Sequence, residues 1–166
     1  MRRSEREIAD KCDIIEVIDK CDVCRIALSQ NNIPYIVPMN FGYEYINGSL
    51  TIYFHCAKEG KKTDIIKENP AACFEMDCSR NLIYSDTACK CSMEYESVIG
   101  IGNIIALVDD SDVEEKRKAL SLIMKNYAPE KTFEFSEAYF TSEMINSVTI
   151  LKLTVDDFTG KRYMKK

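Results

Sequence analysis

The sequence lacks an excess of positive charge. Its 22 lysine and arginine residues are outnumbered by 27 aspartate and glutamate residues, so the formal net charge is −5. Proteins bind nucleic acids largely through phosphate contacts made by clustered basic side chains. We therefore expect no nucleic-acid partner.

Long apolar runs are also missing. No stretch approaches the roughly 20 apolar residues that a membrane-spanning helix requires, and the charged residues 1–7 lead into no hydrophobic targeting segment. We expect a cytoplasmic protein with no membrane partner. In a reducing compartment, the eight cysteines are expected to be buried thiols or metal ligands rather than disulfides.

The chain has little of what marks the common enzyme classes. It contains one histidine, His55, and no carboxylate pair, activated nucleophile or metal cluster that requires catalysis. Gly100 and Gly102 invite a dinucleotide-binding interpretation, but Ile105 replaces the third glycine and no helix is expected to follow. The sequence therefore argues against a Rossmann site.

Two cysteine pairs leave a metal alternative open. Cys21-x-x-Cys24 and Cys89-x-Cys91 could supply four thiolates to tetrahedral zinc. The second spacing is short, however, and Cys24 lies in a strand-like run. We expect no metal site and keep a zinc-stapled interaction module as a minor alternative.

Length and periodicity predict one domain, residues 1–166, with mainly β structure. Asn47-Gly48 is the strongest turn signal, and the glycines at 100 and 102 predict a bend or bulge in a long strand. The expected strands are residues 23–28, 33–45, 50–55, 71–76, 93–108 and 148–155. Together they predict an antiparallel β-barrel decorated with helices.

Four helices are expected around this barrel. The first begins at a capping box formed by Ser4 and Glu7 and runs toward Lys20. The others are residues 62–69, a helix capped by Ser111 or Asp112 and ended by Pro129, and a short helix at residues 136–142. Residues 77–90 are expected to form a loop, and residues 156–166 a charged tail.

Residues 53–62 form the first half of a candidate binding site. A strand ends there, Gly60 relaxes the loop, and a helix begins among lysines. Free N–H groups at a helix start, together with lysines, favour a phosphate. A solvated lysine loop is the alternative interpretation.

Residues 34–41 form the second half. Pro34 and Pro38 cannot donate hydrogen bonds to a sheet, so their strand must lie at an edge or be bulged. Backbone groups near Val37 to Asn40 then need other partners, and the rim of a flat heterocycle would satisfy them. An ordinary edge strand bonded to water is equally consistent.

Together these segments resemble the FMN-binding proteins related to pyridoxamine 5'-phosphate oxidase, especially the nitroimidazole-resistance branch. The resemblance extends over residues 24–28, 34–43, 50–61, 73–77, 95–102 and 115–120. It implies an FMN-binding split β-barrel that forms a homodimer with flavin at the subunit interface. True pyridoxamine 5'-phosphate oxidases contact the substrate phosphate through arginines, of which the middle of this chain has few, so vitamin B6 oxidation is not expected.

The resemblance also assigns residues to the site. The cofactor-binding candidates are Val37, Pro38, Met39, Asn40, His55, Ala57, Lys58, Gly60 and Lys61, with Tyr95 and Ser97 supplied by the partner subunit. His55 is the catalytic candidate, because an imidazole could deliver a proton to a reduced substrate. The implied activity is FMN-dependent reduction of a small aromatic acceptor, such as a nitroaromatic, by a transient electron donor. A flavin carrier or redox sensor without turnover is the alternative.

Overall fold

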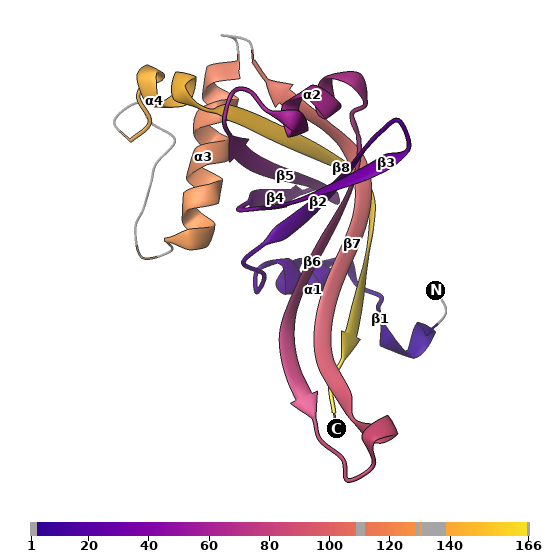
Figure 1. Ribbon diagram of the computed structural model, residues 1–166. Coiled ribbons are helices and arrows are strands. Elements are labelled where there is room, and N and C mark those ends of the chain that lie inside the picture. The colour runs from indigo at the N-terminus through magenta and orange to yellow at the C-terminus, as the bar shows by residue number, and fades with distance from the viewer. Residues whose placement is uncertain (1–2, 109–111, 129, 131–138, 166) are drawn as a thin grey trace.

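The computed structural model describes residues 3–108, 112–128, 130 and 139–165 (Figure 1). Its strands are β1 (Glu7–Ile8), β2 (Cys24–Gln30), β3 (Ile33–Met39), β4 (Gly42–Ile46), β5 (Ser49–Cys56), β6 (Ala71–Ile83), β7 (Ser92–Leu107) and β8 (Thr149–Tyr163). Its helices are α1 (Lys11–Ile18), α2 (Lys61–Glu68), α3 (Val113–Tyr127) and α4 (Ser142–Ser147), with 3₁₀ turns at Ser4–Arg6 and Ala88–Lys90.

The strands form one antiparallel sheet in the order β3-β2-β6-β7-β8-β5-β4, and β1 adds to β8. The two edge strands, β3 and β4, follow one another in the chain but do not pair, so the barrel is split between them. This arrangement confirms the prediction of a mainly β, split-barrel fold.

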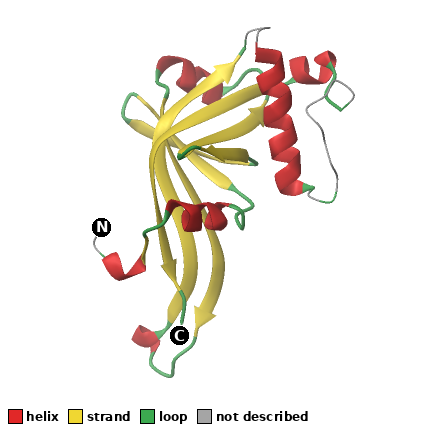
Figure 2. Cartoon of the chain, turned by 180° about the vertical axis from the view of Figure 1, so that it is seen from behind, coloured by secondary structure: helices red, strands yellow, loops and turns green. Residues whose placement is uncertain are grey.

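Apolar side chains fill the inside of the bent sheet. Ile14 and Val17 of α1 pack there with Phe74 of β6, and all three are essentially buried. A smaller cluster around Tyr53 and Ala119 joins α3 to β5. Figure 2 shows α3 lying along one side of the sheet, with α1 farther along the long strands.

The long strands β6, β7 and β8 continue beyond α1 as an arm (Figure 1). We define the arm as residues 79–95, with the end of β8 paired along it: Tyr163 lies opposite Tyr95. A register shift between Cys78 and Asn81 marks its root, where Ser79 has a φ of 58°. A second shift, between Ile101 and Gly102, confirms the bulge predicted from the glycines.

The N-terminal helix begins later than predicted. Ser4 caps no helix through its side chain; instead, the Asp10 carboxylate accepts a hydrogen bond from the backbone N–H of Cys12 at 2.8 Å. The preceding residues pair with the end of β8, opposite Lys161 and Gly160. The predicted capping box is therefore wrong, because this segment is held by the sheet.

Three other boundaries differ from the predictions. The predicted strand 33–45 is broken after Met39, because Phe41 turns into the core and its N–H donates to the Tyr127 hydroxyl at 3.2 Å. Residues 77–83 and 156–163 are strand rather than loop and tail, because each pairs with β7. Residues 136–138 of the predicted helix 136–142 lie outside the described residues, residues 139–141 are not helical, and α4 begins only at Ser142.

The other predicted elements are confirmed, including the hairpin of β2 with β3 and the helix before Pro70. Asp112 stands at the start of α3 without a side-chain cap hydrogen bond, while Ser111 lies outside the described residues. In the part of the chain that the structure describes, no helix combines the length and apolar character needed to cross a bilayer.

Candidate functional site

Strand β3 leaves one of its sides open. Among the described strands it pairs only with β2, where Pro34 lies opposite Ser29 and Pro38 opposite Arg25. Edge strands tolerate proline because the missing N–H can face away from the sheet. The prediction that this strand lies at an edge is confirmed, and the candidate residues Val37 to Asn40 follow its exposed rim and end.

The start of α2 lies beside this edge. Lys61 Nζ is 4.7 Å from the centroid of the Tyr35 ring, and Lys62 Nζ is 3.3 Å from Met39 Sδ. The two candidate segments are therefore neighbours in a single subunit. Tyr35, Val37 and Met39 alternate along β3, so they share the face turned toward these lysines.

The first turn of α2 has the features of an anion site. Gly60 precedes it with a φ of 146°, a conformation that favours glycine. Among the described residues, no side chain caps the start of this helix. The first helical N–H groups have no partner within the helix, and the helix dipole adds partial positive charge there. The Thr63 hydroxyl donates to the Gly60 carbonyl at 2.6 Å and fixes the turn.

The lysines at this turn are not neutralised. Within the described residues, Lys58, Lys61 and Lys62 form no ion pair with a carboxylate, whereas Lys67 on the same helix lies 3.9 Å from Asp64. An aromatic ring and a thioether are weak partners for an ammonium group. The electrostatics of this turn therefore favour an anionic ligand.

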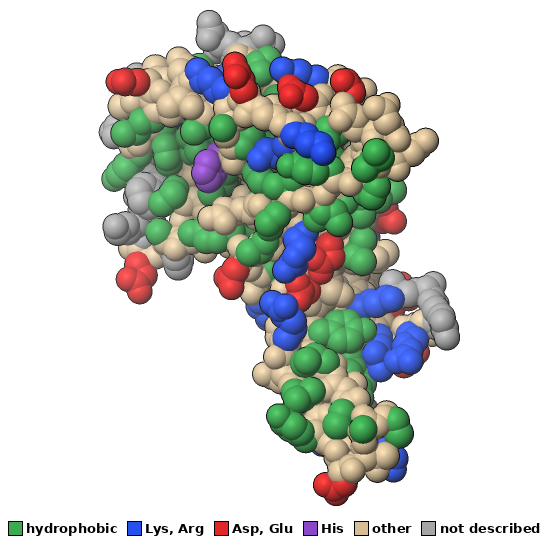
Figure 3. Space-filling view, in the orientation of Figure 1, with side chains coloured by type: hydrophobic (Ala, Val, Ile, Leu, Met, Phe, Trp, Pro, Cys, Tyr) green, Lys and Arg blue, Asp and Glu red, His purple; other side chains and the backbone are tan. Residues whose placement is uncertain are grey.

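His55 and Cys56 end β5 on opposite faces. His55 is exposed opposite Ile150, and Cys56 is half-buried opposite Thr149. Burial raises the pKa of the Cys56 thiol, and the Lys62 ammonium group partly offsets this effect. Strand alternation thus turns Cys56, rather than His55, toward Lys62. Figure 3 shows the single histidine (purple) on the same visible face of the molecule as basic side chains near α2.

Tyr95 and Ser97 do not join this site within one subunit. Both lie on β7 toward the arm, whereas α2 lies near the opposite end of that strand (Figure 1). Arg6 Nη1 donates to the Tyr95 hydroxyl at 3.5 Å, and its guanidinium lies 4.0 Å from the Tyr163 ring centroid. Ser97 is half-buried opposite Asp77 and Lys161.

The few arginines in the middle of the chain have carboxylate partners. Arg25 Nη1 lies 2.9 Å from Glu75 and 2.7 Å from Asp77. Arg80 Nε lies 3.1 Å from Asp77, and Arg117 Nη1 lies 2.8 Å from Glu114. Because these charges are already balanced, the arginines do not resemble a preformed phosphate clamp.

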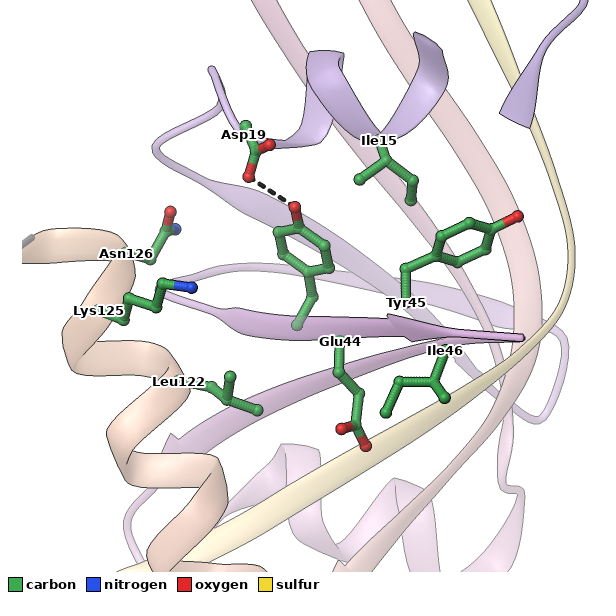
Figure 4. Close-up of a pocket in the computed structure, with 9 residues that line it drawn as sticks. Ile15, Asp19, Glu44, Tyr45, Ile46, Leu122, Lys125 and Asn126 are labelled. Carbon is green, nitrogen blue, oxygen red and sulfur yellow. Dashed lines mark hydrogen bonds between the residues drawn. The ribbon is translucent and has the colours of Figure 1, made fainter. Parts of the chain in front are cut away.

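A separate cavity of about 450 Å³ lies between α1, β4 and α3 (Figure 4). Its lining includes Ile15, Tyr45 and Leu122, and the Tyr43 hydroxyl donates to Asp19 at 2.5 Å. Burial and this bond raise the pKa of Tyr43. Asp19 and Glu44 would repel a phosphate, and none of the predicted cofactor residues lines this cavity.

The two cysteine pairs do not converge. Cys21 and Cys24 are buried near the start of β2, while Cys89 and Cys91 are exposed at the tip of the arm (Figure 1). Among the described residues, no group of three or more histidine, cysteine, aspartate or glutamate side chains is arranged to hold a metal. The four-thiolate alternative has no geometric support.

Tyr35, Cys56 and Lys62 join the candidate site; they lie within the two predicted segments but were not among the predicted cofactor-binding residues. The period-two alternation of β3 could have identified Tyr35, because it shares a face with Val37 and Met39. Lys62 could have been identified from its position in the first turn of α2. Nothing in the sequence distinguished Cys56 from the seven other cysteines.

The chain is thus a split antiparallel barrel whose edge strand β3 lies beside an uncapped, lysine-bearing helix start. The family model for pyridoxamine 5'-phosphate oxidase matches residues 10–162, and the chain belongs to this family. None of the curated proteins matches the chain.

Solved structures agree with this assignment. The chain is similar to a protein from Bacteroides thetaiotaomicron described as a 5-nitroimidazole antibiotic resistance protein, with 33% identity over 93% of this chain and 85% of that one, and a TM-score of 0.74. A FAD and heme binding protein from Mycobacterium smegmatis shares the fold at 14% identity, covering 96% and 74% of the two chains, with a TM-score of 0.74. A FAD-binding protein from Mesorhizobium loti shares it at 16% identity, covering 96% and 98%, with a TM-score of 0.63.

Proposed function

We propose that this protein binds FMN with its phosphate at the start of α2 and its ring along the open edge of β3. The observation that carries the proposal is the set of lysines without carboxylate partners at an uncapped helix start, directly beside an edge strand. Lys58, Lys61 and Lys62 and the backbone N–H groups after Gly60 would hold the phosphate. Free backbone groups near Val37 to Asn40 would bond the polar rim of the ring.

We further propose a homodimer in which the partner contributes residues near Tyr95 and Ser97. The outer face of β7 supports this arrangement, because Ile99 and Ile101 are 51% and 56% exposed on the same face as those two residues. A second copy covering that face would bury these isoleucines. The cytoplasm remains the expected location.

The proposed activity is reduction of a small aromatic acceptor, with a nitroimidazole as the first candidate. This choice is supported by family membership and by the 33% identity to the Bacteroides protein. Bound FMN would supply the redox chemistry by accepting electrons from a transient donor and passing them on. The exposed His55 imidazole would deliver a proton to the reduced acceptor, and the Lys61 and Lys62 side chains would keep the cofactor in place.

Titration of the purified protein with FMN, followed by visible absorption, tests the binding proposal. We expect wild-type protein to bind FMN at micromolar or lower concentration, and K61A/K62A to bind at least about a hundredfold more weakly, since each of the two lost charged contacts weakens binding by about 1.5–3 kcal/mol. The K67A variant is the matched control, because Lys67 is paired with Asp64 on the same helix. Equal FMN affinities of K61A/K62A and K67A would show that the FMN phosphate does not bind at the start of α2.

Turnover separates a reductase from a flavin carrier. Oxidation of NADH or NADPH by the FMN-loaded protein is measured with and without a 5-nitroimidazole. The proposal predicts that acceptor-dependent turnover, measured at saturating FMN, falls about 10²-fold in H55Q, the lower end of what general acid catalysis contributes. Absence of turnover with either donor favours the carrier or sensor.

A further inference from the structure

Two cysteines that are distant in the sequence meet near the end of α1. Cys21 Sγ donates to the Val17 carbonyl oxygen at 3.2 Å, and Cys78 Sγ donates to the same oxygen at 4.0 Å. One thiol lies in the turn after α1, and the other lies at the root of the arm. In the sequence, Cys21 lies three residues before Cys24, but the fold places its thiol next to that of Cys78.

Cys78 is the more accessible of the two thiols. The residue is half-buried, so a small oxidant can reach it, whereas Cys21 and Cys24 are buried. Its Sγ lies 3.9 Å from Glu96 Oε2 and 3.7 Å from the Ser79 hydroxyl oxygen. The register shift directly after Cys78 leaves residues 79–80 without regular pairing, so small adjustments toward disulfide geometry are tolerated.

Cys21 is suited to the second role of such a pair. Burial raises the pKa of the Cys21 thiol, and the neighbouring Cys78 raises it further. Cys21 therefore stays protonated and shielded from solvent, so it is not the first of the two thiols to be oxidised. Its closeness to Cys78 is what allows it to resolve an oxidised neighbour.

We propose that Cys21 and Cys78 form a redox modification site that closes to a disulfide when the folded protein meets a peroxide. The Cys78 sulfur attacks one peroxide oxygen and breaks the O–O bond, and its thiol proton leaves with the departing oxygen as water, giving a sulfenic acid. The Cys21 sulfur then displaces the hydroxyl group, which leaves with the Cys21 proton as a second water. Two electrons pass from the two sulfurs to the peroxide.

The bond would join the turn after α1 to the root of the arm. Because it closes a long loop, it restricts the unfolded chain, and the oxidised protein should have a higher melting temperature than the reduced one. This site is separate from the α2 turn, so the proposal does not depend on flavin binding.

The test uses a C12S/C89S/C91S background, which removes the three exposed thiols. Folded protein is treated with hydrogen peroxide, remaining thiols are alkylated, and unreduced tryptic peptides are identified by mass spectrometry. We expect the peptide 21–25 to be linked to the peptide 68–80. The protein mass falls by two hydrogens, and a reducing agent reverses the change.

Because each of these peptides carries two cysteines, further variants assign the bond. C24S and C73S should keep the linked peptides, and C21S and C78S should lose them. Bonding of Cys21 to Cys24, persistence of the link in C78S, or oxidation of Cys78 to sulfinic acid without any link would each overturn the proposal. C78S changes a half-buried residue, so it serves as the decisive variant if C21S does not fold.

Discussion

Gly42 shows how a single residue can position an element. It begins β4 where that strand meets the backbone of α3, and a Cβ there would lie 2.4 Å from both the Leu122 carbonyl carbon and the Ile123 nitrogen. Real Cβ atoms do not approach main chain so closely, so only glycine allows this contact. The close packing of β4 against α3 therefore depends on Gly42.

We predict that Gly42→Ala destabilises the protein by about 1–3 kcal/mol, because α3 must move away from β4 to admit a methyl group. Urea unfolding followed by circular dichroism measures the change. Gly48→Asn is the control: it lies at a φ of 85° with nothing within 4 Å, and asparagine tolerates that conformation. Equal losses in the two variants would show that the close approach to α3 is unimportant.

The candidate site was only partly predictable at the level of residues. The prolines of β3 and the lysines after Gly60 carried local signals that identified both halves. The side chains that bring the halves together, Tyr35 and Lys62, depend on strand alternation and on where the helix starts. Contributions from a partner subunit leave no local signal, because they depend on how two copies pack.

At the scale of elements, predictions succeeded where turn chemistry was local. Asn47-Gly48 marked the β4–β5 hairpin, and Pro70 marked the end of α2. The arm was missed because residues 77–83 and 156–163 are polar and do not alternate clearly. Those residues become strands through long-range pairing with β7. A short window of the sequence does not include both strands of such a pair, so local patterns do not reveal it.

Glu96 joins three elements at the root of the arm. Its carboxylate, 2% exposed, accepts hydrogen bonds from Lys20 at 3.1 Å, Ser79 at 2.9 Å and Arg162 at 2.5 Å. These groups belong to the turn after α1, the β6 bulge and β8. Burial alone would raise the pKa of Glu96, but the bonds from Arg162, Ser79 and Lys20 outweigh it and hold the pKa below the ordinary 4.5.

A lowered pKa makes this stabilisation depend on pH. The contribution of Glu96 is complete above pH 4.5 and is lost as the pH falls through the folded-state pKa. We predict that E96Q loses about 1–3 kcal/mol of unfolding free energy at pH 7, and that its difference from wild type shrinks below pH 4.5. Urea unfolding at several pH values tests this, with E94Q as the control on the same strand. A difference that grows on acidification contradicts the assignment.

At the scale of the whole molecule, the outer face of β7 exposes the apolar side chains of Ile99 and Ile101, where a second copy is proposed to bind. We predict that the wild-type protein is a dimer by light scattering and that Ile101→Glu is a monomer with weaker FMN binding, because a buried unpaired charge is costly. Ile46→Glu is the control, since Ile46 is 55% exposed on the edge strand β4. A monomeric wild-type protein with full FMN affinity would remove the need for partner residues.

The central claim is that the start of α2 recognises a flavin through its phosphate. The most direct measurement compares the dissociation constants of FMN and riboflavin, which lacks the phosphate, for the wild-type protein at low salt. The account predicts that FMN binds at least about tenfold more tightly, a difference of about 1.4 kcal/mol that shrinks in K61A/K62A. Equal affinity for the two flavins, or no FMN binding at micromolar concentration, would contradict it.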